Sequence, residues 1–555
     1  MSLGSRFLAE LYELPKRQCR AVRTADIRVP MRDGVTLDTV HYAPRLAGGH
    51  PALLMRVPYG LRGFGTVAEC YAERGFHVVL QTCRGTGRSG GSFDPLIHER
   101  EDGLATLDWI KRQDWFDGRL GTSGPSYLGY AQWAICDALP KVSAMATKVT
   151  SAEFKSVVFP GGAFHLGLWL SWLQTVEGLR SNPVLIAQRM WSGSIERKTL
   201  RASMKLPLLD ADKLVTGKRI PFWRRWMNDA IGNKGFWEAI DHTHRLGMRT
   251  PPNHFISGWY DFMLDQLLRD YATLVDAGHK PYLTVGPWFH VSGELQKQSV
   301  KETLTWMRAH LLGDRSGLRD NPVRIHVSGT DEWHEFDVFP PGTPDIQIWH
   351  IHPNGVLSPR PVKNSKPDNY RYDPKKPTPN IGGAIFAFTG AGPVDNAKLE
   401  RRADVLTYTS EPLFTPLTII GNVRVTLHAR ASLPNADFFV RLCDVDENGL
   451  SINICDGFIR LTSAAPAVPD DIWKLNFKLH ATAHCFKRDH RLRLIVASGA
   501  HPRYARNTGT DEPLGEAVTL LPVDIEIFHD PKRPTAIHLP VFELPDNSRQ
   551  KPGTN

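Results

Sequence analysis

The stretch Gly124–Gly129, with the sequence GPSYLG, has the composition of a turn that presents a nucleophile. Ser126 stands between small residues, after a short extended run that ends at Ser123 and before a helix-like apolar run, Tyr130–Cys136. A serine at such a strand-to-helix turn exposes its hydroxyl at the carboxyl end of a parallel sheet. The usual motif has its second glycine two residues after the serine, where this chain has Leu128, so an acid and a base are needed to support it.

An acid and a base follow in the chain order of a Ser–Asp–His triad. Asp261 comes directly after a predicted strand that begins at His254, and His290 follows the next predicted strand, Tyr282–Gly286. Both therefore fall in loops at the sheet edge that also carries Ser126, where open α/β sheets bind ligands. A histidine can remove the serine proton, and a carboxylate can orient the histidine and stabilise its charged form. We expect these three residues to form a catalytic triad.

Three nearby residues are weaker candidates for these roles. Ser123 falls within the end of the strand rather than at the apex of the turn. Asp265 lies one helical turn into the following helix, where we expect a solvated face. His254 begins its strand and is therefore expected at the opposite end of the sheet.

The chain around the triad alternates short apolar strands with helices, which is typical of a parallel α/β sheet. A hairpin is expected over residues 24–44, around the turn Asp33-Gly34. The other predicted strands include Ala52–Val57, His77–Gln81 and Tyr282–Gly286, and the predicted helices are Thr66–Arg74, Arg100–Arg112, Leu264–Asp276 and Gln296–Leu312. Residues 1–149 and 246–318 are thus predicted to form the two parts of one α/β core.

Residues 150–245 interrupt this alternation, because they lack strong strand signals. The segment contains six of the fifteen tryptophans amid basic helical stretches, namely Trp169, Trp172, Trp191, Trp223, Trp226 and Trp237. We interpret it as a helical cap that lies over the sheet. Its aromatic side chains can pack the helices, line a pocket, or do both.

From about residue 320 the chain has many short strand-like runs without helices between them. These runs are Val323–Val327, Ile346–His352, Val423–Leu427, Phe438–Leu442, Leu475–Leu479, Leu492–Val496 and Val523–Phe528. Turns rich in Pro, Gly, Asn and Asp separate them, which predicts a β-sandwich or jelly roll over residues 319–555.

Composition excludes several classes of protein. The net charge is +9, but Lys and Arg are interleaved with Asp and Glu, so nucleic-acid binding is not expected. No apolar run approaches the roughly 18–20 residues of a spanning helix, and Met1–Cys19 lacks the apolar core of a secretory signal. Seven scattered cysteines without CxxC spacing favour free thiols in a reducing, cytoplasmic compartment.

Three patterns could suggest a cofactor or a metal, and each is incomplete. Gly85–Gly90 matches a dinucleotide fingerprint but runs on into more loop sequence instead of opening a helix. Asp444–Gly449 begins like a calcium loop, but position twelve is Cys455 rather than Glu. His350 and His352 share one strand face without an evident third ligand. We expect no metal and no cofactor.

Several motifs together resemble the bacterial cocaine esterase group of hydrolases, which also includes prolyl dipeptidyl peptidases, α-amino-acid ester hydrolases and some cephalosporin acylases. The matching stretches are GPSYLGYAQW from Gly124, GWYD from Gly258, GPWFH from Gly286, Val29–Gly34, Asn453–Arg460 and His501–Asn507. The resemblance covers nearly the whole chain. It implies an α/β-hydrolase core, a helical cap and a C-terminal jelly roll.

The resemblance also implies an oxyanion hole. In this family a tyrosine after an early strand donates its hydroxyl to the oxyanion, beside the backbone N–H that follows the serine. The matching residues are Tyr59 and Tyr127. Fixed donors in a dry site are suited to the charge that develops on a tetrahedral oxygen. The chain departs from the family at Thr82–Gly85, where Asp-x-Arg-Gly is common, so the ion pairing of Arg84 is left open.

We therefore expect a serine hydrolase that cleaves carboxylic esters of a small-molecule acyl substrate through an acyl-enzyme on Ser126. The chain could also form a homo-oligomer. A dipeptidyl peptidase or amide hydrolase is the alternative, and it would need a carboxylate to hold a free amine. Asp331, Glu332 and Glu335 could supply one, although a solvated turn is the simpler interpretation of that cluster. A non-catalytic carbohydrate- or partner-binding protein on the same scaffold is a further alternative, because fold does not fix function.

Overall fold

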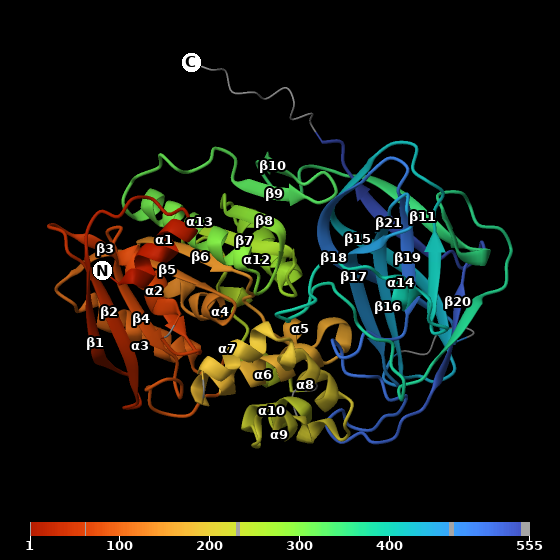
Figure 1. The fold of residues 1–555 in the computed structure, drawn as a ribbon, viewed down its shortest axis with the longest axis horizontal. Coiled ribbons are helices and arrows are strands. Elements are labelled where there is room, and N and C mark those ends of the chain that lie inside the picture. The colour runs from red at the N-terminus through yellow and green to blue at the C-terminus, as the bar shows by residue number, and fades with distance from the viewer. Residues whose placement is uncertain (1, 62, 182, 229–232, 466–470, 545–555) are drawn as a thin grey trace, which may run out of the picture.

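The computed structural model describes residues 2–61, 63–181, 183–228, 233–465 and 471–544 of the 555-residue chain. Figure 1 shows an α/β unit, which contains the N-terminus, beside a unit built of β-strands. A layer of helices, drawn in yellow and olive, lies below the α/β unit and reaches the β-rich unit. The fold is therefore an α/β-hydrolase core with a helical cap and a C-terminal β-sandwich domain, as the sequence predicted.

The first sheet contains ten strands within the described ranges, in the order β1-β2-β4-β3-β5-β6-β7-β8-β9-β10. Its strands are β1 (Ala21–Pro30), β2 (Thr36–Pro44), β3 (His50–Val57), β4 (His77–Thr82), β5 (Phe116–Pro125), β6 (Val142–Lys148), β7 (Asn253–Tyr260), β8 (Tyr282–Phe289), β9 (Val323–Val327) and β10 (Glu332–Phe336). Neighbours from β4 to β9 run parallel, whereas β1–β2, β2–β4 and β9–β10 are antiparallel. The carboxyl ends of the parallel strands consequently meet at one edge.

Helices cover both faces of this sheet. Successive side chains of a strand point to opposite faces, and both faces carry apolar side chains that need to be buried. On β3, Leu53 and Met55 pack with one set of helices, and Leu54 packs with the other. The helices outside the cap are α1 (Leu3–Leu11), α2 (Phe64–Ala72), α3 (Glu99–Lys111), α4 (Tyr127–Trp133), α12 (Leu264–Asp276), α13 (Gly293–Leu311) and α14 (Ala397–Glu400). No helix among the described residues combines the length and the apolar character that crossing a membrane requires.

The cap lies between β6 and β7 in the chain. Its helices are α5 (Lys155–Val158), α6 (Leu166–Ser181), α7 (Pro183–Trp191), α8 (Ser194–Ser203), α9 (Ala211–Thr216), α10 (Pro221–Asn228) and α11 (Lys234–Ala239). Five of the six tryptophans in this segment are buried in one aromatic cluster, but Trp191 at the end of α7 is 89% exposed. The interpretation of all six as interior residues is therefore wrong for Trp191.

The C-terminal unit is a second sheet system around an apolar core, and its paired strands are antiparallel except for β12 and β14, which run parallel. Its strands are β11 (Asp345–His352), β12 (Val356–Ser358), β13 (Asp368–Tyr372), β14 (Val405–Thr409), β15 (Leu417–Ala431), β16 (Ala436–Val445), β17 (Ser451–Leu461), β18 (Trp473–Phe486), β19 (Arg491–Ala497), β20 (Val523–Phe528) and β21 (Ala536–Val541). The turn at Asp444–Gly449 joins β16 to β17 as a hairpin. Gly85–Gly90 is likewise a loop, as expected.

One predicted strand belongs to the other sheet. Val323–Val327 was expected to begin the β-sandwich, but as β9 it pairs in parallel with β8 and extends the hydrolase sheet. The strand follows α13, so β8, α13 and β9 form one more strand–helix–strand crossover. Ser328, directly after it, makes a bridge to His484 of β18, and this contact joins the two units.

Two of the family motifs meet between the units in a buried ionic cluster. Asp456 of β17 accepts from Arg441 at 2.8 Å and from Arg503 at 2.6 Å, and all three side chains are at most 2% exposed. His480 Nδ1 lies 3.7 Å from the same carboxylate, and its Nε2 lies 3.8 Å from Asp265 of α12. The cluster thus connects the β-sandwich domain to the helix that follows Asp261.

Arg84 keeps ion pairs despite the departure from the family motif. Its guanidinium contacts Asp102 of α3 and Asp33 of the β1–β2 turn, each at 2.6 Å. The two carboxylates raise the pKa of Arg84 above its ordinary value. The ion pairing of Arg84, which the sequence left open, is thus made with Asp33 and Asp102 from other parts of the chain.

Candidate active site

Ser126 occupies the sharp turn between β5 and α4. Its backbone has φ 57° and ψ −121°, a conformation that is strained for a residue with a side chain. The Ser126 N–H donates to the carbonyl of Lys148 at the end of β6, and the Thr150 hydroxyl donates to the Ser126 carbonyl. These bonds hold the turn against the neighbouring strand. The geometry is that of a nucleophile elbow at the carboxyl edge of the sheet.

The displaced glycine of the motif has a packing reason. A Cβ on Gly124 would lie 2.3 Å from the Leu128 side chain, so Leu128 occupies the space that this glycine leaves. A Cβ on Gly129 would lie 2.4 Å from the Thr150 side chain, which lies against the start of α4. The elbow therefore requires a glycine three residues after Ser126 rather than two.

The structure brings Ser126, His290 and Asp261 together. His290 Nε2 lies 3.1 Å from Ser126 Oγ, and His290 Nδ1 lies 2.5 Å from Asp261 Oδ2. The second Asp261 oxygen accepts the N–H of Met263 at 2.8 Å. Asp261 and His290 stand directly after β7 and β8, so both reach the edge that carries the elbow. This arrangement supplies a nucleophile, a base and an orienting carboxylate.

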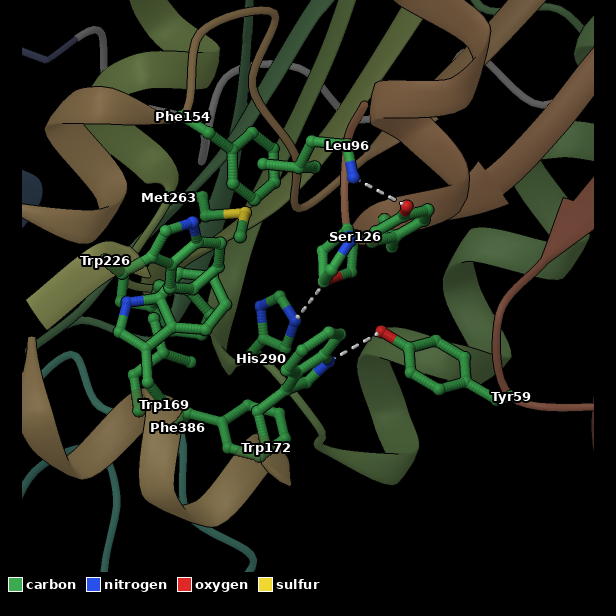
Figure 2. Close-up of a pocket in the computed structure, with 14 residues that line it drawn as sticks. Tyr59, Leu96, Ser126, Phe154, Trp169, Trp172, Trp226, Met263, His290 and Phe386 are labelled. Carbon is green, nitrogen blue, oxygen red and sulfur yellow. Dashed lines mark hydrogen bonds between the residues drawn. The ribbon is translucent and has the colours of Figure 1, made fainter. Parts of the chain in front are cut away.

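Two phenylalanines enclose the imidazole. The ring centroid of Phe262 lies 4.4 Å from that of His290, and the ring of Phe386 meets it edge-on at 5.7 Å. Phe386 comes from a loop before β14, so the C-terminal part of the chain completes the site. Figure 2 shows Phe386 below His290 and beside Trp172. Sequence reasoning missed Phe386, because a single aromatic residue in a Gly-rich loop carries no periodic signal.

The two predicted oxyanion donors also lie at the elbow. The Tyr59 hydroxyl accepts the indole N–H of Trp172 at 3.1 Å and interacts with Ser126, and burial raises the pKa of Tyr59 to about 12. Because Trp172 occupies one lone pair, the proton of Tyr59 remains available to an oxyanion. Tyr127 is the first residue of α4, and such a residue has no intrahelical partner for its N–H.

A buried network supports both donors. The Tyr127 hydroxyl donates to Glu99 at 2.8 Å, and Glu99 pairs with Arg56 at 2.8 Å. Arg56 lies on β3, three residues before Tyr59. Glu99 and Arg56 are at most 3% exposed, and neither was singled out from the sequence. Arg56 was the available signal, because it is a charged residue in the otherwise mostly apolar strand β3, whereas Glu99 is one of four consecutive charged residues at the start of α3.

Two cavities meet at Ser126. The first, which we call the slot, is lined mainly by aromatic and aliphatic side chains and encloses about 20 Å³, enough for about one water. The second, which we call the chamber, has a volume of about 430 Å³. Ser126, His290, Tyr59, Trp172 and Phe386 line both cavities. In Figure 2 the slot lies between Trp169, Trp226, Phe154, Met263 and the catalytic candidates.

Charge is nearly absent from these cavities. Among the described residues that line the slot there is no Lys, Arg, Asp or Glu. Lys148 is the one such residue among those described around the chamber. Within the described ranges, no group of three or more His, Cys, Asp or Glu side chains is placed to hold a metal ion.

The weaker sequence candidates lie elsewhere. Ser123 is buried within β5, and His254 contacts the Thr284 hydroxyl near the start of β7. Asp265 is not on a purely solvated face as expected, because its carboxylate accepts from Asn422 and from the Ala481 N–H of the β-sandwich domain. The acidic cluster at 331–335 belongs to the β9–β10 hairpin and does not line the slot or the chamber.

Comparison with known proteins agrees with this geometry. Residues 33–292 match the model for the X-Pro dipeptidyl-peptidase (S15 family), and residues 317–539 match that for the X-Pro dipeptidyl-peptidase C-terminal non-catalytic domain. A cocaine esterase of Rhodococcus sp. (strain MB1 Bresler) is 31% identical over 94% of this chain and 98% of its own length. The chain belongs to the cocaine esterase and X-Pro dipeptidyl-peptidase family of α/β-hydrolases. It is a serine hydrolase.

Solved structures of the same fold cover nearly the whole chain. An α-amino acid ester hydrolase aligns with a TM-score of 0.79 at 20% identity, over 94% of this chain and 97% of that chain. An aminopeptidase from a marine-sediment Thaumarchaeota archaeon aligns with the same TM-score at 23% identity, over 95% of this chain and 98% of its own. At these identities the likeness concerns the fold.

Proposed function

We propose that this chain is an esterase for carboxylic esters with a short, uncharged acyl group, and that Ser126, His290 and Asp261 are its catalytic residues. The observation that carries the proposal is the slot beside Ser126, which is narrow, apolar and free of carboxylates among its described lining residues. Such a pocket favours a small apolar group and offers no partner to a free amine.

The proposed reaction follows from the contacts of the triad. His290 Nε2 takes the Ser126 proton as Oγ attacks the ester carbonyl, and Asp261 stabilises the imidazolium. The Tyr59 hydroxyl and the Tyr127 N–H hold the oxyanion. His290 then protonates the departing alkoxide, and a water that His290 deprotonates hydrolyses the acyl-enzyme. Because burial raises the pKa of Tyr59, the hydroxyl stays protonated at neutral pH and can donate throughout.

We assign the acyl group to the slot and the leaving alcohol to the chamber. Tyr127, whose N–H would bind the oxyanion, lines the slot but not the chamber. Val291, Ser292 and Gly293, which directly follow the histidine that must protonate the leaving group, line the chamber. The larger volume of the chamber also suits the more variable half of an ester.

A series of 4-nitrophenyl esters tests the proposal. We expect kcat/KM to be highest for acetate and to fall as the acyl chain lengthens to octanoate, because the slot of about 20 Å³ cannot hold a long chain. In Trp169→Leu the optimum should move to longer acyl groups, whereas Trp191→Leu, far more exposed, should leave it unchanged. No hydrolysis of any ester by the wild-type protein would refute the proposal.

Dipeptidyl-peptidase activity is the alternative to exclude. One relative is named Xaa-Pro dipeptidyl-peptidase and another putative Xaa-Pro dipeptidyl-peptidase, and they are 22% and 28% identical to parts of this chain. A prolyl dipeptide anilide should be cleaved far more slowly than butyrate ester, since a protonated amine would be left unpaired in an apolar slot. Cleavage of the anilide alone would reverse this ranking. A fluorophosphonate probe should label Ser126, which a non-catalytic binding protein would not allow.

We also propose a cytoplasmic location. All seven cysteines are free in the structure, and six of them are buried. Unpaired thiols are typical of reducing compartments. Fractionation of cells that produce the native protein tests this, and recovery outside the cytoplasm would contradict it.

A further inference from the structure

Lys148 is a buried charged side chain that the mechanism above does not use. It is the last residue of β6, where it pairs with Pro125 of β5 and Ile256 of β7. Its carbonyl accepts the Ser126 N–H at 2.8 Å, so the residue is fixed directly beside the elbow. Only 3% of its surface is exposed, and it lines the chamber that also contains Ser126 and His290.

Burial is the one influence on the Lys148 ammonium that the described part of the chain shows, with no acidic side chain or hydrogen bond acting on it. Burial without an anionic partner lowers the pKa of Lys148 to about 7. Lys148 contributes to the electrostatic environment of His254, whose pKa is held well below its usual range mainly by burial, so that imidazole is neutral. A buried ion of this kind is costly unless something pairs with it.

The residues around Lys148 indicate what kind of group could pair with its ammonium. The polar side chains that α13 and its N-cap residue contribute to the chamber are uncharged, namely Ser292, Gln296 and Ser299. No Asp or Glu occurs among the described lining residues, so the protein itself offers no counter-ion. An anion that enters with the substrate would pair with the buried ammonium inside the chamber of about 430 Å³, and charge-assisted hydrogen bonds to a buried group are strong.

We propose that Lys148 recognises a carboxylate on the leaving-alcohol half of the ester, so that the natural substrate class is esters of hydroxy acids. This inference rests on the proposed esterase function and on the assignment of the leaving group to the chamber. Lys148 is then a specificity-determining residue, and the reaction releases a hydroxy acid together with a short carboxylic acid.

The test compares two chromogenic esters that differ only in one carboxylate, 4-nitrophenyl butyrate and 3-carboxy-4-nitrophenyl butyrate. For the wild-type protein we expect kcat/KM to be about 10- to 100-fold higher for the carboxylated ester, mainly through KM. Lys148→Met, which removes the charge at similar length, should abolish this preference, measured as the ratio of the two kcat/KM values within the variant. Lys148→Arg should retain part of the preference.

The hydrolysis rates distinguish failure of the inference about Lys148 from failure of the esterase proposal. If the wild-type protein hydrolyses the neutral ester but shows no preference, or if Lys148→Met keeps the preference, the inference is wrong and the esterase proposal stands. If neither ester is hydrolysed, the esterase proposal itself fails. The 4-nitrophenyl hemisuccinate ester carries its carboxylate on the acyl half, and a preference for it that depends on Lys148 would overturn the leaving-group assignment. A melting temperature for Lys148→Met at or above that of the wild type confirms that the variant folds.

Discussion

Two buried carboxylates of this protein are paired in opposite ways. Asp261 contacts one imidazole, His290, whose other nitrogen faces Ser126 and two cavities. Asp456 lies between two guanidinium groups, Arg441 and Arg503, in a contact that is sealed from solvent. The cations hold the pKa of Asp456 well below its usual range, so its charge is fixed. A carboxylate beside a base that can gain and lose a proton supports chemistry, whereas one between permanent cations supports the domain interface.

The largest effect on activity should come from a change at Ser126, which contacts the imidazole that is paired with Asp261. Ser126→Ala should lower kcat by about 10⁴- to 10⁶-fold, because no nucleophile remains for the acyl-enzyme. The unfolding transition should stay cooperative, since the hydroxyl is a small part of the elbow. Turnover within tenfold of wild type on 4-nitrophenyl butyrate would contradict the assignment.

Asp456→Asn should act on stability instead. Removal of the charge leaves two buried guanidinium groups without their counter-ion, which costs about 3–5 kcal/mol in the free energy of unfolding. The matched control is Asp524→Asn, which breaks an exposed pair with Arg371 in the same domain and should cost less than about 1 kcal/mol. Urea titration measures both. Equal losses for the two variants would remove the distinction between a sealed and an exposed carboxylate.

Tyr59→Phe should lower kcat by about 10²- to 10³-fold with little change in KM, as expected for a donor that acts on the transition state. Trp172 would lose a hydrogen-bond acceptor, so the melting temperature of the variant serves as the folding control. A change confined to KM would assign Tyr59 to substrate binding rather than to the oxyanion.

Asp270 extends the comparison, because this buried carboxylate contacts neither an imidazole nor a guanidinium group within the described part of the chain. It accepts the Ala152 N–H at 2.8 Å, and burial raises its pKa from 3.8 to about 7. A raised acid pKa means that the folded state binds the proton more tightly than the unfolded state, so stability falls as the pH rises from about 4 to 7. Asp270→Asn should remove this decline and gain about 1–3 kcal/mol at pH 8. An unchanged pH dependence would contradict the role of Asp270.

The proximity of Ser126, Asp261 and His290 could be predicted from sequence because each residue stands at the end of a strand. Ser126, Asp261 and His290 follow runs whose apolar character is local, and parallel topology then brings the strand ends together. The placement of Val323–Val327 could not be predicted in this way. A short apolar strand looks the same in either sheet, and its pairing with β8 depends on how α13 crosses the sheet.

The residues that line the cavities around Ser126 were harder to predict than Ser126, Asp261 and His290 themselves. Phe386 reaches His290 from a loop almost 100 residues later in the chain, and nothing in its local sequence indicates that contact. Lys148 ends an apolar strand, where a charged residue usually marks the return to solvent. Only the three-dimensional packing of α13 and the elbow shows that this lysine is enclosed.

Glu99 gives the two proposed oxyanion donors a common point of attachment. One of its oxygens holds Tyr127 at the elbow, and the other holds Arg56 on the strand that leads to Tyr59. The spacing between the hydroxyl and the amide is thus set by a single carboxylate rather than by two independent loops. Sequence changes at the two tyrosines should therefore be non-additive, and a lineage that alters one donor would be expected to adjust this shared anchor before it alters the other.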